Sequence, residues 1–224
     1  IGLIGSSIAR AIKKKNLSKR ICIFSRSQKT INKAKKLKLG NIYTTHLKQS
    51  VKNSDLVILC TPLSTYETIL KKISNNIMPN AILSDVGSVK LSVDKIFSKF
   101  LNKGFHIIPA HPIAGTEKSG PEAGFAELFV RRWCVLTPSS NYDKKSLNKI
   151  QKLWINLGSK TLIMKPENHD KILALTSHMP HLISYSIVSS VLNINAKEKS
   201  KVIKFELFCR YHALQFYKKQ YLQI

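Results

Sequence analysis

Short apolar runs alternate with amphipathic stretches along most of the chain. Runs bounded by polar or turn-forming residues, such as Asp55–Cys60, are typical of buried parallel strands. By this criterion the sequence predicts strands at residues 20–26, 41–43, 55–60, 81–85 and 105–110, and later at 133–137 and 160–163.

Between these strands, apolar residues recur at helical spacing. The first such stretch places Ile8, Ala9, Ala11 and Ile12 on one side of a helix, and further helices are predicted at 28–39, 66–74, 90–100 and 143–157. Gly40 is predicted to be the C′ glycine that ends the second helix. Strands separated by single helices favour a doubly wound parallel sheet, the Rossmann type of α/β fold.

After Pro166 the pattern is helical alone, with apolar residues such as Ile172, Leu182 and Ile187 at helical spacing. We therefore predict two domains: residues 1–164 form the sheet domain, and residues 165–224 form a smaller helical one.

The composition is that of a globular protein, with 43% hydrophobic residues and a formal net charge of +25. The lysines are spread over nearly every predicted helix and are not gathered in one stripe. This distribution favours the composition of an A+T-rich gene, and not a nucleic-acid-binding surface, as the source of the high positive charge. The four cysteines have no C-x-x-C spacing, and no run approaches the roughly 18 apolar residues of a membrane span. We expect a cytoplasmic protein with reduced thiols, and neither nucleic acid nor membrane as a partner.

The chain opens with a truncated dinucleotide-binding pattern. Gly2-Leu3-Ile4-Gly5 fits the second half of G-x-G-x-x-G; the first glycine and the strand before it are expected to be missing from this sequence. Gly2 would let the backbone approach a pyrophosphate, and Gly5 would let the helix pack closely on the sheet. The amino end of that helix would then face the phosphates.

The end of the second strand bears on the choice of cofactor. An acidic residue at this place usually binds the ribose 2′-hydroxyl of NAD, whereas this chain has Ser25-Arg26. A guanidinium can bind a 2′-phosphate, and no carboxylate repels it. The pair favours NADP over NAD.

A second candidate centre follows the strand at 105–110. His111 is predicted to lie where that strand gives way to a glycine-containing loop, the edge at which parallel sheets bind ligands. An imidazole there can exchange a proton near neutral pH. Thr61-Pro62 and Ser88 follow two other predicted strands, so these residues could face one ligand.

His178 and His181 are three residues apart on the helical remainder, a spacing that could share a metal ion. Pro180 between them favours a helix start or a kink, and the sequence offers no evident third ligand. We expect no metal site.

Taken together, these motifs resemble the prephenate and arogenate (cyclohexadienyl) dehydrogenase family. The resemblance covers about residues 1 to 205. Within it, Gly120–Ala126 and Arg132–Cys134 resemble the alphaproteobacterial branch of the family. It is carried by Gly2–Gly5, Leu59–Pro62, Asp85–Lys90, His111–Ala126, Arg132–Cys134 and Ser177–His181.

The resemblance implies oxidative decarboxylation of prephenate or arogenate in tyrosine biosynthesis, with hydride transfer to NAD or NADP. It implies that His111 is the catalytic histidine, that Ser88 orients it, and that the helical remainder begins a dimerisation domain. By the same resemblance, Thr116, Glu117, His178 and His181 would line the substrate pocket. The cofactor positions would be Gly2, Leu3, Ile4, Gly5, Ser25, Arg26, Thr61 and Pro62.

The resemblance ends near Phe205. The family continues there with a glycine-rich segment that holds a substrate-binding arginine, whereas this chain reads Glu206–Phe216 without glycine. We expect a frameshift or truncation at this point, with loss of the remaining dimerisation helices, so that homodimer formation is doubtful for this chain.

Three other hypotheses stay open on the sequence alone. The chain could be a non-catalytic remnant that keeps a dinucleotide-binding fold, or a dehydrogenase of the β-hydroxyacid type, which generally uses a catalytic lysine. A nucleic-acid-binding module is the third.

Overall fold

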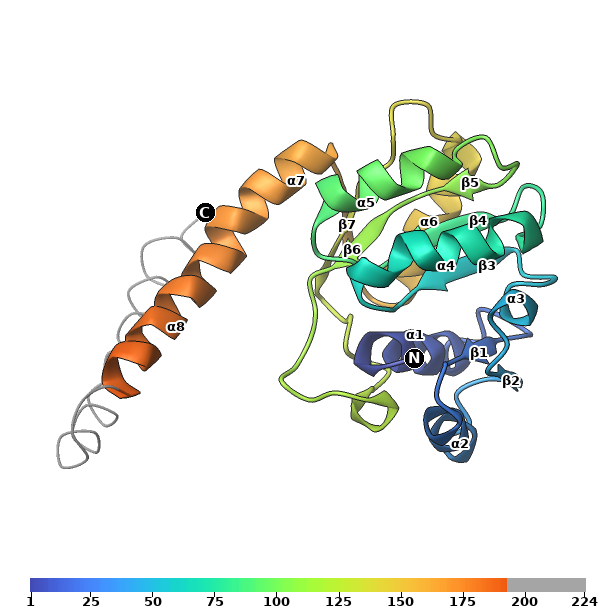
Figure 1. Ribbon diagram of the computed structural model, residues 1–224, viewed down its shortest axis with the longest axis horizontal. Coiled ribbons are helices and arrows are strands. Elements are labelled where there is room, and N and C mark those ends of the chain that lie inside the picture. The colour runs from blue at the N-terminus through green and yellow to red at the C-terminus, as the bar shows by residue number, and fades with distance from the viewer. Residues whose placement is uncertain (193–224) are drawn as a thin grey trace. The chain divides into compact units, whose positions relative to one another are not determined.

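The structure is a computed structural model that describes residues 1–192 (Figure 1). Contacts between residues divide it into two compact units, Ile1–Lys171 and Ile172–Ile224, which we describe separately. The predicted frameshift or truncation near Phe205 lies outside the described residues.

Parallel strands form the centre of the first unit, as the sequence predicts. Two of the three groups are entirely parallel: β1 (Cys22–Phe24) pairs with β2 (Ile42–Thr44), and β4 (Ile82–Asp85) lies between β3 (Leu56–Leu59) and β5 (His106–Ile107). In the third group, β7 (Trp133–Leu136) lies between β6 (Ala110–Pro112) and β8 (Lys160–Ile163).

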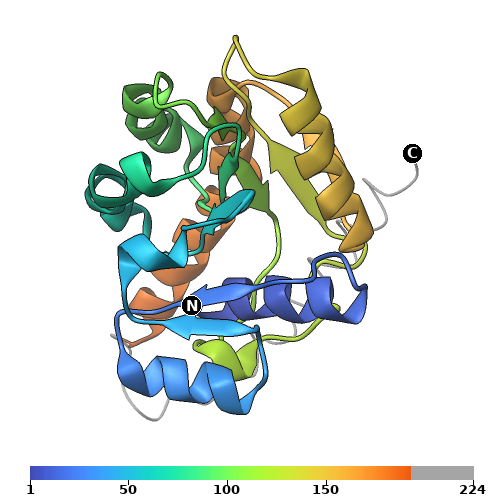
Figure 2. The same ribbon diagram turned by 90° about the vertical axis from the view of Figure 1, so that its right-hand side faces the viewer.

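Helices connect these strands and cover the sheet (Figures 1 and 2). They are α1 (Leu3–Lys14), α2 (Gln28–Lys36), α3 (Leu47–Ser50), α4 (Tyr66–Ile73), α5 (Lys90–Phe97) and α6 (Lys144–Asn156), with short 3-10 turns at Leu63–Thr65, Ser74–Asn76, Ser98–Phe100 and η4 (Pro121–Ala123). The side chains predicted to form the apolar side of α1 are all buried. This alternation confirms the doubly wound α/β fold.

The predicted strand at 105–110 is in fact two strands that belong to different groups. Ile108 still donates its N–H to Leu83 of β4, but Pro109 has no N–H, and its carbonyl instead accepts from Thr137 beyond β7. The chain thereby changes partner, and β6 runs antiparallel to β7. His111, predicted to lie where this strand gives way to a loop, is instead the central residue of β6, which ends one residue later at Pro112.

The predicted role of Gly40 is also wrong. Helix α2 ends at Lys36, and Lys38 takes the left-handed conformation, with φ of +51°, that ends such helices. Gly40 has another function, because a Cβ there would lie 2.7 Å from the carbonyl oxygen of Ile21. It lets the chain pass close to the segment that leads into β1.

A buried ion pair joins the centre of this unit. Lys90, the first residue of α5, and Asp85, the last residue of β4, are each 0% exposed. The Lys90 ammonium donates to both carboxylate oxygens of Asp85 at 2.8 Å and to the carbonyl oxygen of Ala110 at 2.7 Å. Asp85 also accepts the N–H of Ala110 at 3.1 Å. Both backbone polar groups of Ala110 are thus held by one ion pair.

The second unit is helical where it is described. Helix α7 (Pro166–Leu173) leads into it, a π-helical segment (Ala174–His178) follows, and α8 (Met179–Leu192) begins at the next residue. Pro180 lies in the first turn of α8, where its missing N–H is tolerated. Leu175, Leu182 and Ile183 are more than half exposed. No helix within residues 1–192 is long and apolar enough to cross a membrane.

Removing one partner of the ion pair should destabilise this unit. We expect Lys90→Met to cost about 3–5 kcal/mol of unfolding free energy at neutral pH, because it leaves the buried Asp85 carboxylate without its cation. Chemical denaturation measures this change. Lys95→Met, on the exposed side of the same helix, is the matched control and should change stability by no more than about 0.5 kcal/mol. Equal effects of the two substitutions would contradict the role of the pair.

Candidate active site

The amino end of α1 has the features that a dinucleotide pyrophosphate requires. Gly2 precedes the helix in an extended conformation, and a Cβ built there meets no atom within 4 Å, so the space in front of the helix is open. A Cβ at Gly5 would lie 3.2 Å from Cys60 Cβ, so this glycine lets α1 approach the end of β3. Leu3 and Ile4, between them, pack against the main hydrophobic core. The residues present therefore fit a bound dinucleotide.

A loop that the sequence analysis named only for the family resemblance packs against the start of α1. Figure 2 shows the η4 segment beside this helix. The Ser7 hydroxyl donates to the carbonyl of Leu3 at 2.8 Å and accepts the N–H of Phe125 at 3.1 Å. A Cβ at Gly124 would overlap the Ser6 hydroxyl, so only glycine permits this approach. The repeated small residues of α1 and of this loop are the sequence signal for the contact.

The other proposed cofactor residues lie at the ends of β1 and β3. Ser25 is largely buried, and its hydroxyl accepts the N–H of Ser27 at 3.3 Å, whereas Arg26 is exposed. Thr61 accepts a hydrogen bond from the Thr65 hydroxyl at 2.9 Å, and Pro62 precedes the 3-10 turn that contains Thr65. Arg26 is thus the accessible cation at the end of β1.

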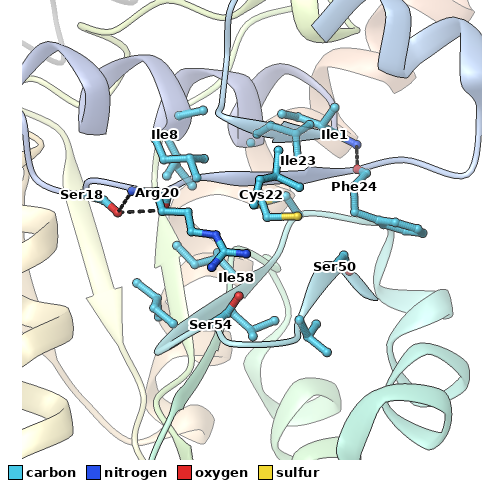
Figure 3. A pocket seen from close by; sticks show the side chains of 18 of the residues that line it. Ile1, Ile8, Ser18, Arg20, Cys22, Ile23, Phe24, Ser50, Ser54 and Ile58 are labelled. Carbon is cyan, nitrogen blue, oxygen red and sulfur yellow. Dashed lines mark hydrogen bonds between the residues drawn. The ribbon is translucent and has the colours of Figure 1, made fainter. Parts of the chain in front are cut away.

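The cavity next to these strand ends has a volume of about 620 Å³. It lies between β1 and β3, and Figure 3 shows Arg20, Cys22 and Ile58 among its lining side chains. Gly5, Cys60 and Thr61 line it as well, but His111 does not. Its walls combine apolar side chains such as Ile23 and Ile58 with polar ones such as Arg20 and Ser54, and the cavity is separate from the region around His111.

His111 is 9% exposed and lies on β6. Its position depends on the preceding residue, since Ala110 is held at both its N–H and its carbonyl by the Asp85–Lys90 pair. Ser88, the residue proposed to orient it, is exposed in the loop between β4 and α5. The loop that carries Ser88 follows β4, which ends at Asp85, and Asp85 binds the N–H of Ala110 next to His111.

The sequence analysis missed two residues that lie directly behind His111. His169 is 0% exposed, and its Nε2 lies 2.8 Å from Nδ1 of His111. The other nitrogen of His169, Nδ1, lies 2.7 Å from Oδ1 of Asp170. Asp170 also accepts the N–H of Lys90 at 2.8 Å and that of Leu91 at 3.0 Å, at the start of α5. The only signal in the sequence was the adjacent His-Asp pair in the first turn after Pro166.

The environment perturbs the proton affinity of several of these groups. Burial lowers the pKa of His169, although the carboxylate of Asp170 opposes this. Partial burial raises the pKa of Asp170, but hydrogen bonds from the Leu91 and Lys90 N–H groups and from His169 outweigh it, and the pKa is lowered. Burial also lowers the pKa of Lys90, against the attraction of Asp85. These directions favour a neutral His169 beside an ionised Asp170.

Three of the remaining predicted residues, Thr116, Glu117 and His178, are exposed. Thr116 and Glu117 belong to the exposed loop after β6, where the Thr116 hydroxyl accepts the N–H of Lys118 at 3.2 Å. His178 is exposed at the end of the π-helical segment, and His181 lies in α8 of the second unit. The assignment of His178 and His181 to the substrate pocket stays a prediction. Within residues 1–192, no group of three His, Cys, Asp or Glu side chains is arranged to hold a metal ion.

Comparison with known proteins places this chain in a family. The family model described as prephenate dehydrogenase, nucleotide-binding domain, matches residues 8–163, and that described as prephenate dehydrogenase, dimerization domain, matches residues 165–209. Cyclohexadienyl dehydrogenase of Zymomonas mobilis is 35% identical over 205 residues, which are 92% of this chain and 70% of that protein.

Solved structures agree with this assignment. Prephenate dehydrogenase from Aquifex aeolicus has a TM-score of 0.80 and 31% identity, over 88% of this chain and 71% of that one. A structure of prephenate dehydrogenase from A. aeolicus in complex with hydroxyphenyl propionate and NAD+ has a TM-score of 0.78 and 30% identity, over 88% and 69% of the two chains. Since the two family models lie in succession over residues 8–209 and the fold agrees with these structures, this chain belongs to the prephenate dehydrogenase family of nicotinamide-dinucleotide-dependent oxidoreductases.

Proposed function

We propose that this chain oxidises prephenate or arogenate, removing a hydride from C4 of the ring and the proton of the 4-hydroxyl, after which loss of carbon dioxide gives an aromatic product. The observation that carries this proposal is the position of His111. His111 is a largely buried imidazole on β6, and the Asp85–Lys90 ion pair holds Ala110, the residue before it. The chain also belongs to the prephenate dehydrogenase family.

His111 takes the 4-hydroxyl proton as the carbonyl forms, which is general base catalysis. Ser88 orients His111 and the ring from the loop after β4. We assign Thr116, Glu117, His178 and His181 to substrate binding. The bound cofactor supplies the hydride acceptor, while the protein contributes position and electrostatics.

The cofactor residues are Gly2, Leu3, Ile4, Gly5, Ser25, Arg26, Thr61 and Pro62. The open space before Gly2 takes the pyrophosphate at the amino end of α1. The exposed Arg26 guanidinium binds a ribose 2′-phosphate, so NADP is preferred to NAD.

We assign residues 1–164 to the dinucleotide-binding domain and residues 165–224 to part of a dimerisation domain. The match of residues 165–209 to a dimerisation-domain model supports the second assignment, as do the exposed apolar side chains Leu175, Leu182 and Ile183. A homodimer would cover such side chains.

The reaction is tested with the purified 224-residue chain and a His111→Asn variant. We expect reduced cofactor to form from prephenate or arogenate with NAD or NADP, and the variant to lose at least about 100-fold in kcat because the base is gone. The absorbance of the reduced nicotinamide measures the rate.

The matched control is His106→Asn, on the neighbouring strand β5, which should keep the rate. Cofactor binding without turnover of either substrate would identify a non-catalytic remnant. Turnover that survives in His111→Asn would contradict the assignment of the base.

Cofactor preference is tested at the end of β1. We expect Arg26→Ala to weaken NADP binding about tenfold, a loss of about 1.4 kcal/mol, while NAD binding stays unchanged. Arg20→Ala, two residues before the start of the same strand, should affect neither cofactor. Fluorescence titration gives both dissociation constants, and equal losses for the two cofactors would refute a 2′-phosphate contact.

The phosphate site is tested at Gly2. A Cβ there meets no protein atom, so we expect Gly2→Val to leave the melting temperature unchanged but to weaken binding of both dinucleotides at least about tenfold. If the variant binds NAD and NADP as the original chain does, the pyrophosphate lies elsewhere.

A further inference from the structure

The three side chains behind the site form a continuous hydrogen-bonded row. Asp170 Oδ1 lies 2.7 Å from His169 Nδ1, and His169 Nε2 lies 2.8 Å from His111 Nδ1. Side-chain exposure is 0% for His169 and 18% for Asp170. The direction in which each bond donates decides which nitrogen of His111 carries a proton.

Asp170 fixes the direction at one end of the row. Its two oxygens accept the N–H groups of Lys90 and Leu91, so the carboxylate acts as an acceptor at both oxygens. A carboxylate with this set of donors is ionised and has no proton to give. His169 must therefore donate its Nδ1–H to Asp170.

The remainder of the row follows from the chemistry of neutral imidazole, which has one N–H and one acceptor nitrogen. With Nδ1 of His169 protonated, Nε2 is the acceptor, and His111 must donate its own Nδ1–H to it. Burial lowers the pKa of His169, which keeps its ring neutral to lower pH than usual.

We propose that His169 and Asp170 are positioning residues that hold His111 in the Nδ1–H tautomer, so that Nε2 of His111 is the basic nitrogen presented to the substrate. This inference rests on the proposed function for its catalytic meaning, but the tautomer itself is a property of the folded chain. In an imidazole, the hydrogen bond made by one ring nitrogen decides whether the other nitrogen carries the proton.

The row also stabilises the protonated state of His111. When the substrate hydroxyl gives its proton to Nε2, His111 becomes a cation that still donates Nδ1–H to His169, with the Asp170 carboxylate next in the row. No proton need leave His169 or Asp170, so the proton taken from the oxygen stays on His111. A carboxylate and an imidazole in such a row orient a base and stabilise its imidazolium.

Protonation of His169 would reverse the row. Its Nε2–H would then donate to Nδ1 of His111, which would move the proton of His111 to Nε2 and remove the base. The charged groups facing His169 are Asp170 from α7, Lys90 from α5 and Asp85 from β4; Lys90 lowers its pKa, and the two carboxylates raise it.

The first test measures the tautomer without any turnover. Imidazole nitrogen and carbon correlations in the 15N-histidine-labelled chain distinguish a protonated ring nitrogen from an unprotonated one, and His111→Asn and His169→Gln variants assign the signals. We expect His111 protonated at Nδ1 and unprotonated at Nε2 near neutral pH. His111 with its proton on Nε2 would overturn the inference, whether or not the chain turns over substrate.

The second test compares two substitutions of His169. Leucine removes the acceptor, whereas the side-chain oxygen of glutamine can replace Nε2. We expect His169→Leu to lower kcat about 10- to 100-fold with little change in KM, and His169→Gln to keep most of the rate. His169→Leu should also move the acidic limb of the kcat/KM profile to lower pH, because the imidazolium loses the acceptor that stabilises it.

The outcomes separate this inference from the proposed function. Melting temperatures of both variants show whether the fold is kept. If the original chain shows no turnover, the proposed function fails, while the spectra still decide the tautomer. If turnover requires His111 but His169→Leu and His169→Gln both keep the original rate and pH profile, His169 does not position the base and the inference is wrong.

Discussion

The buried pair of Asp85 and Lys90 is the interaction on which the geometry of this molecule depends. It joins the end of β4, the start of α5 and β6, because the Lys90 ammonium and the Asp85 carboxylate each bind the backbone of Ala110. A charge with no exposure to water is tolerated only when its hydrogen bonds are made. The pair therefore fixes the residue before His111, and Asp170 caps the helix that begins with Lys90.

This arrangement separates the parts of the site. The amino end of α1 is open at Gly2 and close to β3 at Gly5, which suits a dinucleotide. The proposed proton-transfer part lies on β6, where His111 contacts a second buried imidazole. A hydrogen-bonded row of polar groups behind a proposed base suits a site in which orientation contributes to the rate.

Local patterns predicted most of the fold and part of the site. The apolar runs gave nearly all strands within a few residues, and the helical spacing gave α1, α4 and α6, because burial of one face decides both patterns. The split of the strand before His111 was not predicted, since an apolar run does not show at which residue a strand changes partner. The role of Gly40 was also misassigned: Lys38 takes the left-handed conformation, and Gly40 is needed for a contact with a distant carbonyl.

The sequence by itself determined the class of fold, the dinucleotide pattern at Gly2 and Gly5, and the family resemblance that singles out His111, because each depends on residues close together in the chain. Tertiary structure decided the rest. His169 lies 58 residues after His111, and no local pattern indicates that their rings meet. In the same way, the sequence analysis placed Asp85 at the end of a strand and Lys90 at the start of a helix, without a contact between them. Only the packed fold buries both charges and directs them to Ala110, because hydrogen bonds between distant segments follow from burial and not from spacing.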